Sequence, residues 1–309
     1  MSLLRGIVPP LLTPLHPDGT LDLDSLDRLV DHLLNGGADG VFVMGSSGQV
    51  AYLTDAERDL VTRRVVARVG GRVPVLAGTP ELSARRVVES ARRAQDCGVD
   101  AVVVTAPLYC LNDNAELAQH FRMVADGVTL PVVAYDVPVR VRAKLDPFML
   151  VELGKEGVIV GVKDSSGDDV AFRRLVLANA DAGRPLELST GHEVMVDGMA
   201  LLGADGCVPG LANVDPRGYR RLWDAAQAGD WTAARAEQDR ITRLFGIAFV
   251  PQGRSGDAGG IGAFKAALAR LGVIDSATMP APLQALAGAD LDAIADILAG
   301  VGLLEAAVA

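Results

Sequence analysis

Short apolar runs alternate with amphipathic helical patterns through the first two thirds of this 309-residue chain. The runs expected to form strands are Gly6–Thr13, Gly40–Gly45, Val73–Gly78, Ala101–Pro107, Pro131–Pro138, Val158–Ser165, Glu187–Gly191 and Gly206–Gly210. The helices expected between them are Leu23–Asn35, Asp55–Val69, Ser83–Cys97, Asn114–Asp126, Pro147–Gly154, Asp168–Ala182 and Glu193–Leu202. Strands that are apolar along their whole length are buried on both faces, so the alternation predicts a parallel sheet covered by helices.

A repeated junction before three of these strands favours closure of the sheet into a barrel. Residues 37–41, 98–102 and 203–207 read GADGV, GVDAV and GADGC, with a glycine after a helix, then a turn, then a strand. Repetition of one strand–helix unit is typical of an eight-stranded (β/α)8 TIM barrel. Glycine caps before buried strands also occur in other α/β folds, so the repeat favours the barrel without deciding it.

The pattern changes after the eighth strand. Helical patterns then follow one another without strands, at Pro216–Ala228, Trp231–Phe249, Ile261–Leu271 and Pro282–Leu303. The first of these is the last helix of the barrel. The sequence therefore predicts a barrel domain over residues 1–228 and a small helical C-terminal extension over residues 229–309. Within the extension, Pro251–Gly260 is a glycine-rich connection that we expect to be mobile.

Charge and cysteine content argue against several classes of partner and compartment. The formal net charge of −10 at pH 7 disfavours nucleic acid or an anionic membrane as the main partner. Cys97, Cys110 and Cys207 are odd in number and lie in separate segments, which predicts no disulfide framework. No apolar run is long enough to span a bilayer, and the N-terminus lacks the features of a signal peptide. A cytoplasmic protein is expected.

One of the predicted buried strands contains a lysine. The stretch at residues 158–167 reads VIVGVKDSSG and carries Lys163 near its C-terminal end. A buried ammonium group is unfavourable unless it is paired or deprotonated, and a neutral amine can attack a carbonyl to form a Schiff base. The alternative is a side chain that extends from the strand end to pair with a carboxylate, and this segment alone leaves both interpretations open. Arginine cannot act as such a nucleophile, and the only other lysines are Lys144, Lys155 and Lys265.

Other polar groups follow the predicted strands at the end where barrel active sites lie. The second strand ends in GSSG at residues 45–48, whose N–H groups and hydroxyls can hold a carboxylate. The fourth strand is followed by Tyr109, and the fifth carries Tyr135 and is followed by Arg140. Imine chemistry moves a proton in each step and needs such a set of groups. Taken singly, they are also ordinary turn, packing and surface residues.

Other chemistries lack their motifs. The four histidines are dispersed, so no metal site is predicted. No Gly-x-Gly-x-x-Gly follows the first strand, and Gly-x-Ser-x-Gly is absent, so a dinucleotide site and a serine hydrolase are not supported.

The order of the motifs resembles the dihydrodipicolinate synthase and N-acetylneuraminate lyase family of class I aldolases. The motifs are GSSG at 45–48, PLY at 107–109, YDVP at 135–138 and GVKDSSG at 161–167, and FKAAL at 264–268 extends the resemblance to the C-terminal helices. The resemblance implies a Schiff-base aldolase or lyase that makes or cleaves a carbon–carbon bond between pyruvate and an aldehyde. It also implies that no metal or organic cofactor is needed, and that the enzyme is a homotetramer built from two dimers.

The same resemblance implies a role for each matching residue. Lys163 matches the Schiff-base lysine, Tyr135 the proton-shuttling tyrosine, and Tyr109 the tyrosine that one subunit lends to its dimer partner. The loop that binds the pyruvate carboxylate and links the two tyrosines matches Gly45, Ser46, Ser47 and Gly48. Further substrate-binding positions are Arg140, Ser165, Gly191, Glu193 and Val208.

Departures from the family pattern leave the second substrate open. Arg140 falls where the synthases bind the carboxylate of their aldehyde, whereas Glu193 matches an acidic sugar-binding position of the lyases. Val194 and Gly210 stand where lyases carry a glutamate and a serine, and Gln49 replaces the usual glutamate of the loop. An imine-dependent dehydratase or hydratase-aldolase, or a non-catalytic regulatory relative that binds pyruvate or a sugar acid, remain alternatives.

Overall fold

Eight short parallel strands pair around a ring in the computed structural model, which describes residues 2–305. From β2 to β8, neighbours in the chain are neighbours in the sheet, and β1 pairs with β8. This is the topology of a (β/α)8 barrel, so the predicted fold class is confirmed. The strands are β1 (Gly6–Ile7), β2 (Val41–Val43), β3 (Val75–Gly78), β4 (Ala101–Thr105), β5 (Val132–Asp136), β6 (Gly161–Asp164), β7 (Glu187–Thr190) and β8 (Gly206–Cys207).

Backbone hydrogen bonds just beyond β1 close the ring against β2. Pro10 forms a parallel bridge with Phe42. The Phe42 N–H donates to the Pro9 carbonyl at 3.0 Å, and the Leu11 N–H donates to the Phe42 carbonyl at 2.8 Å. Closing the ring covers the two strand edges that an open sheet would expose.

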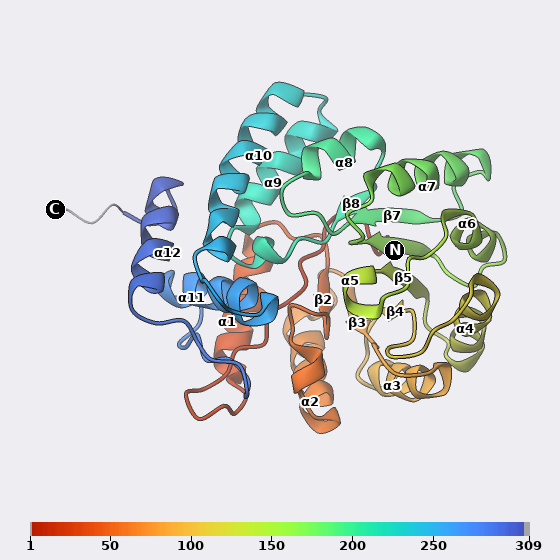
Figure 1. Cartoon of the computed structure of the whole chain (residues 1–309), viewed down its shortest axis with the longest axis horizontal. Helices are drawn as coiled ribbons and strands as arrows, with labels where there is room; N and C mark the ends of the chain where they lie inside the picture. The colour runs from red at the N-terminus through yellow and green to blue at the C-terminus, as the bar shows by residue number, and fades with distance from the viewer. Residues whose placement is uncertain (1, 306–309) are drawn as a thin grey trace.

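Helices cover the outside of the ring (Figure 1). Two of them begin at capping boxes, formed by Thr54 and Glu57 at α2 and by Asp113 and Glu116 at α4. Such caps satisfy free N–H groups of the first turn. The helix expected from Glu193 begins only at Val196. The helices of the barrel are α1 (Leu23–Asn35), α2 (Asp55–Val69), α3 (Ala84–Asp96), α4 (Asn114–Gly127), the short α5 (Pro138–Val141), α6 (Pro147–Lys155), α7 (Asp169–Asp181), α8 (Val196–Leu202) and α9 (Pro216–Gln227).

The apolar runs of the sequence form the strands because they are buried on both faces. Every residue of β4 and β5 is buried, and the strand and helix side chains share one apolar core. The strands are shorter than the runs that predicted them. The run Val158–Ser165, for example, contributes only Gly161–Asp164, the part that lies in register with both β5 and β7.

The C-terminal helices pack on one side of the barrel, away from α3 and α4 (Figure 1). They are α10 (Trp231–Phe245), α11 (Gly262–Arg270) and α12 (Ala289–Gly300). α10 contacts α8 and α9, and α12 contacts α10 and α11. The predicted extension is therefore present, whereas the domain boundary after residue 228 stays a prediction. Within residues 2–305, no helix is both long and apolar enough to cross a membrane.

Two helices of the extension are shorter than the sequence pattern suggested. The helix expected over Trp231–Phe249 loses its last turn, which tightens into a 3-10 helix, η3 (Gly246–Phe249). The helix expected over Pro282–Leu303 begins only at Ala289. Gly288, just before it, has a φ of 59° in the left-handed region, which a continuous right-handed helix does not allow.

Gly206 lies at the seam between β8 and β1, where the two backbones are closest. A Cβ at this position would lie 1.9 Å from the Leu4 carbonyl oxygen and 2.7 Å from the Gly6 carbonyl oxygen. We expect Gly206→Ala to lower the free energy of unfolding by about 1–3 kcal/mol or more, because backbone atoms cannot move aside as a flexible side chain can. Urea unfolding measures the change.

Gly300→Ala is the matched control. Gly300 is the last residue of α12, and nothing lies within 4 Å of a Cβ placed there. Alanine is the better helix former by about 1 kcal/mol at most, so this variant should be as stable as the parent or slightly more stable. Equal losses of unfolding free energy in both variants would show that the close approach of β1 and β8 at Gly206 is not what makes the substitution costly.

Candidate active site

Four neighbouring strands each place one residue at the same level near the C-terminal end of the barrel. Thr105 pairs in register with Tyr135, Tyr135 with Lys163, and Lys163 with Ser189. Partners in a parallel pair project to the same face of the sheet. The predicted nucleophile and the predicted proton-shuttling tyrosine are therefore neighbours because β5 and β6 are neighbours.

Lys163 is buried among aromatic rings and is only 4% exposed. Its Nζ lies 4.6 Å from the centroid of the Phe42 ring and 4.1 Å from that of the Tyr135 ring. Among residues 2–305, no carboxylate lies within ion-pair distance of this nitrogen. The alternative interpretation, a lysine that leaves the strand to pair with a carboxylate, does not describe this side chain.

A cavity of about 390 Å³ opens beside these rings, over the ends of β2 to β5. Phe42 and Tyr135 form part of its wall, together with Gly45 and Ser46 of the loop after β2 and Arg140 of α5. The cavity therefore adjoins the rings around Lys163, the loop expected to bind a carboxylate and the expected guanidinium. Lys163, Ser47 and Gly48 themselves are not among the described residues that line it. Its volume suits a small molecule.

The loop after β2 is a tight turn that the barrel holds in place. The Gln49 N–H donates to the Ser46 carbonyl at 3.0 Å, and the Thr13 hydroxyl donates to the Gly48 carbonyl at 2.8 Å. A Cβ at Gly45 would lie 2.8 Å from the aromatic ring of β2. Glycine at this position lets the loop approach that ring closely.

Glu193 organises the loop after β8. Its Oε1 accepts the Gly210 N–H at 2.7 Å, and its Oε2 accepts the Leu211 N–H at 2.9 Å. Burial raises the pKa of the Glu193 carboxyl, although these N–H groups act in the opposite direction. A Cβ at Gly210 would lie 3.2 Å from the Ser47 Oγ, so this loop also meets the loop after β2. Glu193 thus has a structural partner, and its contact with substrate stays a prediction.

Three further predicted residues follow β6, β7 and β8 at the same end of the barrel. Gly191 packs on Ser165, because a Cβ at Gly191 would lie 1.9 Å from the Ser165 hydroxyl oxygen. The Val208 N–H donates to the Thr190 carbonyl at 2.7 Å. Ser165, Gly191 and Val208 are not among the described residues that line the large cavity.

Asp257 pairs with Arg140, and sequence reasoning missed it. The Arg140 Nη1 donates to Asp257 Oδ2 at 3.1 Å, and Nη2 donates to Oδ1. The Tyr52 hydroxyl lies 3.5 Å from the same Oδ2. Asp257 belongs to the connection Pro251–Gly260, where it begins a π-helical turn, η4 (Asp257–Ile261). No local signal marks this contact, because 117 positions separate the two residues.

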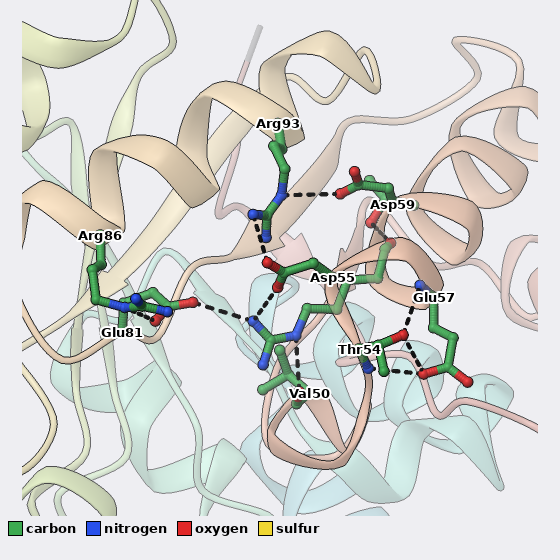
Figure 2. A network of polar contacts seen from close by, with 10 residues as sticks. Val50, Thr54, Asp55, Glu57, Asp59, Glu81, Arg86 and Arg93 are labelled. Carbon is green, nitrogen blue, oxygen red and sulfur yellow. Dashed lines mark hydrogen bonds and ion pairs between the residues drawn. The ribbon is translucent and has the colours of Figure 1, made fainter.

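A network of ion pairs joins α2 to α3 beside the cavity (Figure 2). Arg58 and Glu81 both line the cavity and pair at 3.3 Å. Glu81 also pairs with Arg86 at 3.2 Å, and Asp55 pairs with Arg93 at 2.8 Å. The network balances the charges of this wall within the protein and connects the loop after β3 to two helices.

Tyr109 lies outside this assembly. It is 97% exposed, has a φ of 70°, which is unusual for a residue other than glycine, and does not line the cavity. Leu111 in the same loop is 90% exposed, and Val139 in α5 is 83% exposed. One chain by itself therefore does not bring Tyr109 to Tyr135, and it leaves apolar side chains uncovered near these loops.

Lys265 is a second buried lysine, and it must be distinguished from Lys163. It belongs to α11, is 0% exposed, and its Nζ donates to the Thr278 carbonyl at 2.9 Å. Burial lowers its pKa to about 7. The amine is engaged by this backbone carbonyl, whereas the Lys163 nitrogen lies against two rings of the cavity wall, so the low pKa of Lys265 does not mark it as the nucleophile.

The chain is similar to known proteins along nearly its whole length. Residues 3–300 match the dihydrodipicolinate synthetase family. A 4-hydroxy-tetrahydrodipicolinate synthase from Xanthomonas campestris is 40% identical over 239 residues, which are 77% of this chain and 78% of that protein. Dihydrodipicolinate synthase from Bacteroides thetaiotaomicron superposes with a TM-score of 0.91 at 30% identity, covering 97% of this chain and 100% of that one. A prophage protein of the dihydrodipicolinic acid synthase family from E. coli K12, solved in complex with pyruvate, gives a TM-score of 0.91 at 28% identity, covering 98% and 100%.

The burial of Lys265 predicts a pH dependence of stability. Its pKa of about 7 in the folded protein lies below the ordinary value of about 10.4 that the unfolded chain has. Between these values the unfolded chain binds more protons, so the contribution of Lys265 to stability rises with pH, by up to about 1.4 kcal/mol per unit. Below pH 7 the destabilisation is fully present.

The difference in unfolding free energy between Lys265→Met and the parent should therefore shift in favour of the parent as the pH rises from 7 to 9. Urea unfolding at several pH values measures this difference. Lys155→Met, at a half-exposed lysine, is the control and should show no such trend. If the two variants behave alike with pH, Lys265 does not titrate as its burial implies.

Proposed function

This chain belongs to the dihydrodipicolinate synthetase family and is a lyase of the pyruvate-dependent, Schiff-base aldolase type, and we propose that Lys163 is its nucleophile. The family predicted from the sequence motifs is thereby confirmed. The observation that carries the proposal is the register pair of Tyr135 and Lys163 beside the cavity. The amine has no carboxylate partner among the described residues, so it is free to bond to carbon.

In the proposed reaction, the Lys163 amine attacks C2 of pyruvate, and the resulting carbinolamine loses water to form an imine. Loss of a proton from C3 gives an enamine, whose C3 adds to the carbonyl carbon of an aldehyde, and the new alkoxide takes up a proton. Water then hydrolyses the imine and releases a 4-hydroxy-2-oxo acid and the free amine. Cleavage follows the same steps in reverse. We assign the proton relay to Tyr135, the neighbour of Lys163 in register, whose ring centroid lies 4.1 Å from the amine nitrogen.

The loops at this end of the barrel supply the binding groups. We assign the pyruvate carboxylate to the N–H groups of Gly45–Gly48 and to the hydroxyls of Ser46 and Ser47. Arg140 contacts the distal end of the aldehyde from the cavity wall. The remaining proposed substrate-binding residues are Ser165, Gly191, Glu193 and Val208.

The proposed chemistry needs no metal or organic cofactor, because the imine itself withdraws electrons from C3. We place the enzyme in the cytoplasm. Cys97, Cys110 and Cys207 are free thiols, as is usual for proteins of a reducing compartment.

We further propose that Tyr109 completes the site of a partner subunit in a homotetramer built from two dimers. Its exposure of 97%, together with the exposed Leu111 and Val139, is what an interface residue looks like in a single chain. In the dimer, Tyr109 would extend the proton path from Tyr135 through Ser47.

Borohydride trapping tests the nucleophile. Reduction in the presence of pyruvate should leave a stable adduct on the peptide that contains Lys163, because borohydride converts the imine to a secondary amine. Lys163→Ala should give no adduct and no turnover, yet unfold at the parent temperature. Intact mass and peptide mapping give the readout. Lys155→Ala is the control and should carry the same adduct on Lys163 as the parent. If the parent binds pyruvate but carries no adduct after reduction, the chain is a pyruvate-binding protein with this fold and does not form the imine.

Mixed oligomers test whether Tyr109 acts across an interface. Lys163→Ala and Tyr109→Phe enzymes should each be nearly inactive alone. In a hybrid, a Tyr109→Phe subunit keeps its own Lys163 and receives Tyr109 from its Lys163→Ala partner, so activity should return. Turnover by co-expressed, differently tagged hybrids measures this. Purified hybrids without activity would show that Tyr109 does not act on the partner's site.

A further inference from the structure

The acidic partner of Arg140 changes what the cavity can bind. Arg140 and Asp257 both line the cavity that also contains Tyr135, and their side chains are 43% and 20% exposed. Two guanidinium nitrogens donate to the two carboxylate oxygens, which is the strong bidentate arrangement. The pair has no net charge, so the guanidinium does not face the cavity as an unbalanced cation.

The neighbouring polar groups on this wall are also without net charge. Arg58 pairs with Glu81. The Tyr52 hydroxyl lies beside Asp257, and both burial and that carboxylate raise the pKa of Tyr52, so the phenol stays neutral. The wall therefore presents N–H and O–H groups to a substrate, but no excess positive charge.

We propose that Asp257 is a specificity-determining residue that makes the site select an aldehyde with an uncharged, oxygen-bearing distal end over one with a distal carboxylate. The inference rests on the proposed function and names the class of its second substrate. A carboxylate on the remaining N–H groups of Arg140 would lie beside the like-charged Asp257, and displacing Asp257 would exchange one charge-assisted pair for another and gain little. A hydroxyl, carbonyl or ester oxygen can accept from the remaining N–H groups of Arg140 while the pair stays intact.

The position of Asp257 in the chain separates this selection from the chemistry. Lys163 and Tyr135 belong to barrel strands, whereas Asp257 begins η4, between α10 and α11 in the C-terminal extension. A substitution at Asp257 therefore alters the cavity wall without touching the register of β5 and β6.

A matched pair of aldehydes tests the proposal. Succinic semialdehyde carries a distal carboxylate, and methyl 4-oxobutanoate is its uncharged methyl ester. With pyruvate, the parent enzyme should have the higher kcat/KM for the ester. Asp257→Asn should raise the acid-to-ester ratio of kcat/KM about tenfold or more, because it frees Arg140 for the carboxylate. Adding Arg140→Ala should remove that gain.

Asp292→Asn is the control, because Asp292 is an exposed acid in the first turn of α12 and its loss should leave the ratio unchanged. Asp257→Ser gives a second charge-removing variant if Asp257→Asn does not fold. An unmoved ratio in a folded variant overturns the proposal, and so does a parent enzyme that prefers the acid.

Borohydride trapping of pyruvate on each variant distinguishes failure of the proposed function from failure of the specificity assigned to Asp257. A parent without an adduct on Lys163 means that the proposed function is wrong. A normal adduct with an unmoved acid-to-ester ratio means that only the specificity assigned to Asp257 is wrong.

Discussion

The hydrogen bonds between β5 and β6 fix which side chains meet above the barrel, and the site depends on them. Tyr135 is paired with Lys163, and the next pair along the strands is Asp136 with Asp164. Because successive residues of a strand face opposite sides, the amine and the two carboxylates are separated by the sheet. On the outer side, Lys144 pairs with Asp136 and lies 3.9 Å from Asp164. A slip of one residue would exchange these groups and destroy the site.

Acids and bases are distributed around the cavity so that most charges are already balanced. Arg58 and Arg140 are held by Glu81 and Asp257, and Glu193 is held by backbone N–H groups. Balanced groups keep fixed positions without ligand, which favours pre-organised binding over rearrangement. Lys163 is the exception, since its nitrogen lies against two aromatic rings and forms no ion pair with a carboxylate within residues 2–305. Among the lysines, this contrast singles out Lys163 as the amine that no hydrogen bond or ion pair of the described residues engages.

Sequence reasoning succeeded where a residue's environment follows from its own segment. The burial of Lys163 follows from its place in a run of β-branched residues, and the strand centres follow from continuous apolar runs. It failed where the environment of a residue depends on segments far away in the sequence. Asp257 looked like part of a glycine-rich connection, and only the folded extension brings it to Arg140. The predicted strands were too long because a strand ends where its pairing with both neighbours stops, and the apolar run continues beyond that point.

The pairing of β1 with β8 has a consequence for how the chain reaches its folded state. Gly6 pairs with Gly206, so the first strand finds this neighbour only 200 positions later in the chain. On the ribosome, β1 to β7 must wait as an open sheet until the segment with β8 has emerged. Contacts of such large sequence separation slow folding, because the entropy of a long loop is lost before the contact forms. An unfinished barrel would thus expose two strand edges during synthesis, and this is the stage at which the chain depends most on protection from aggregation.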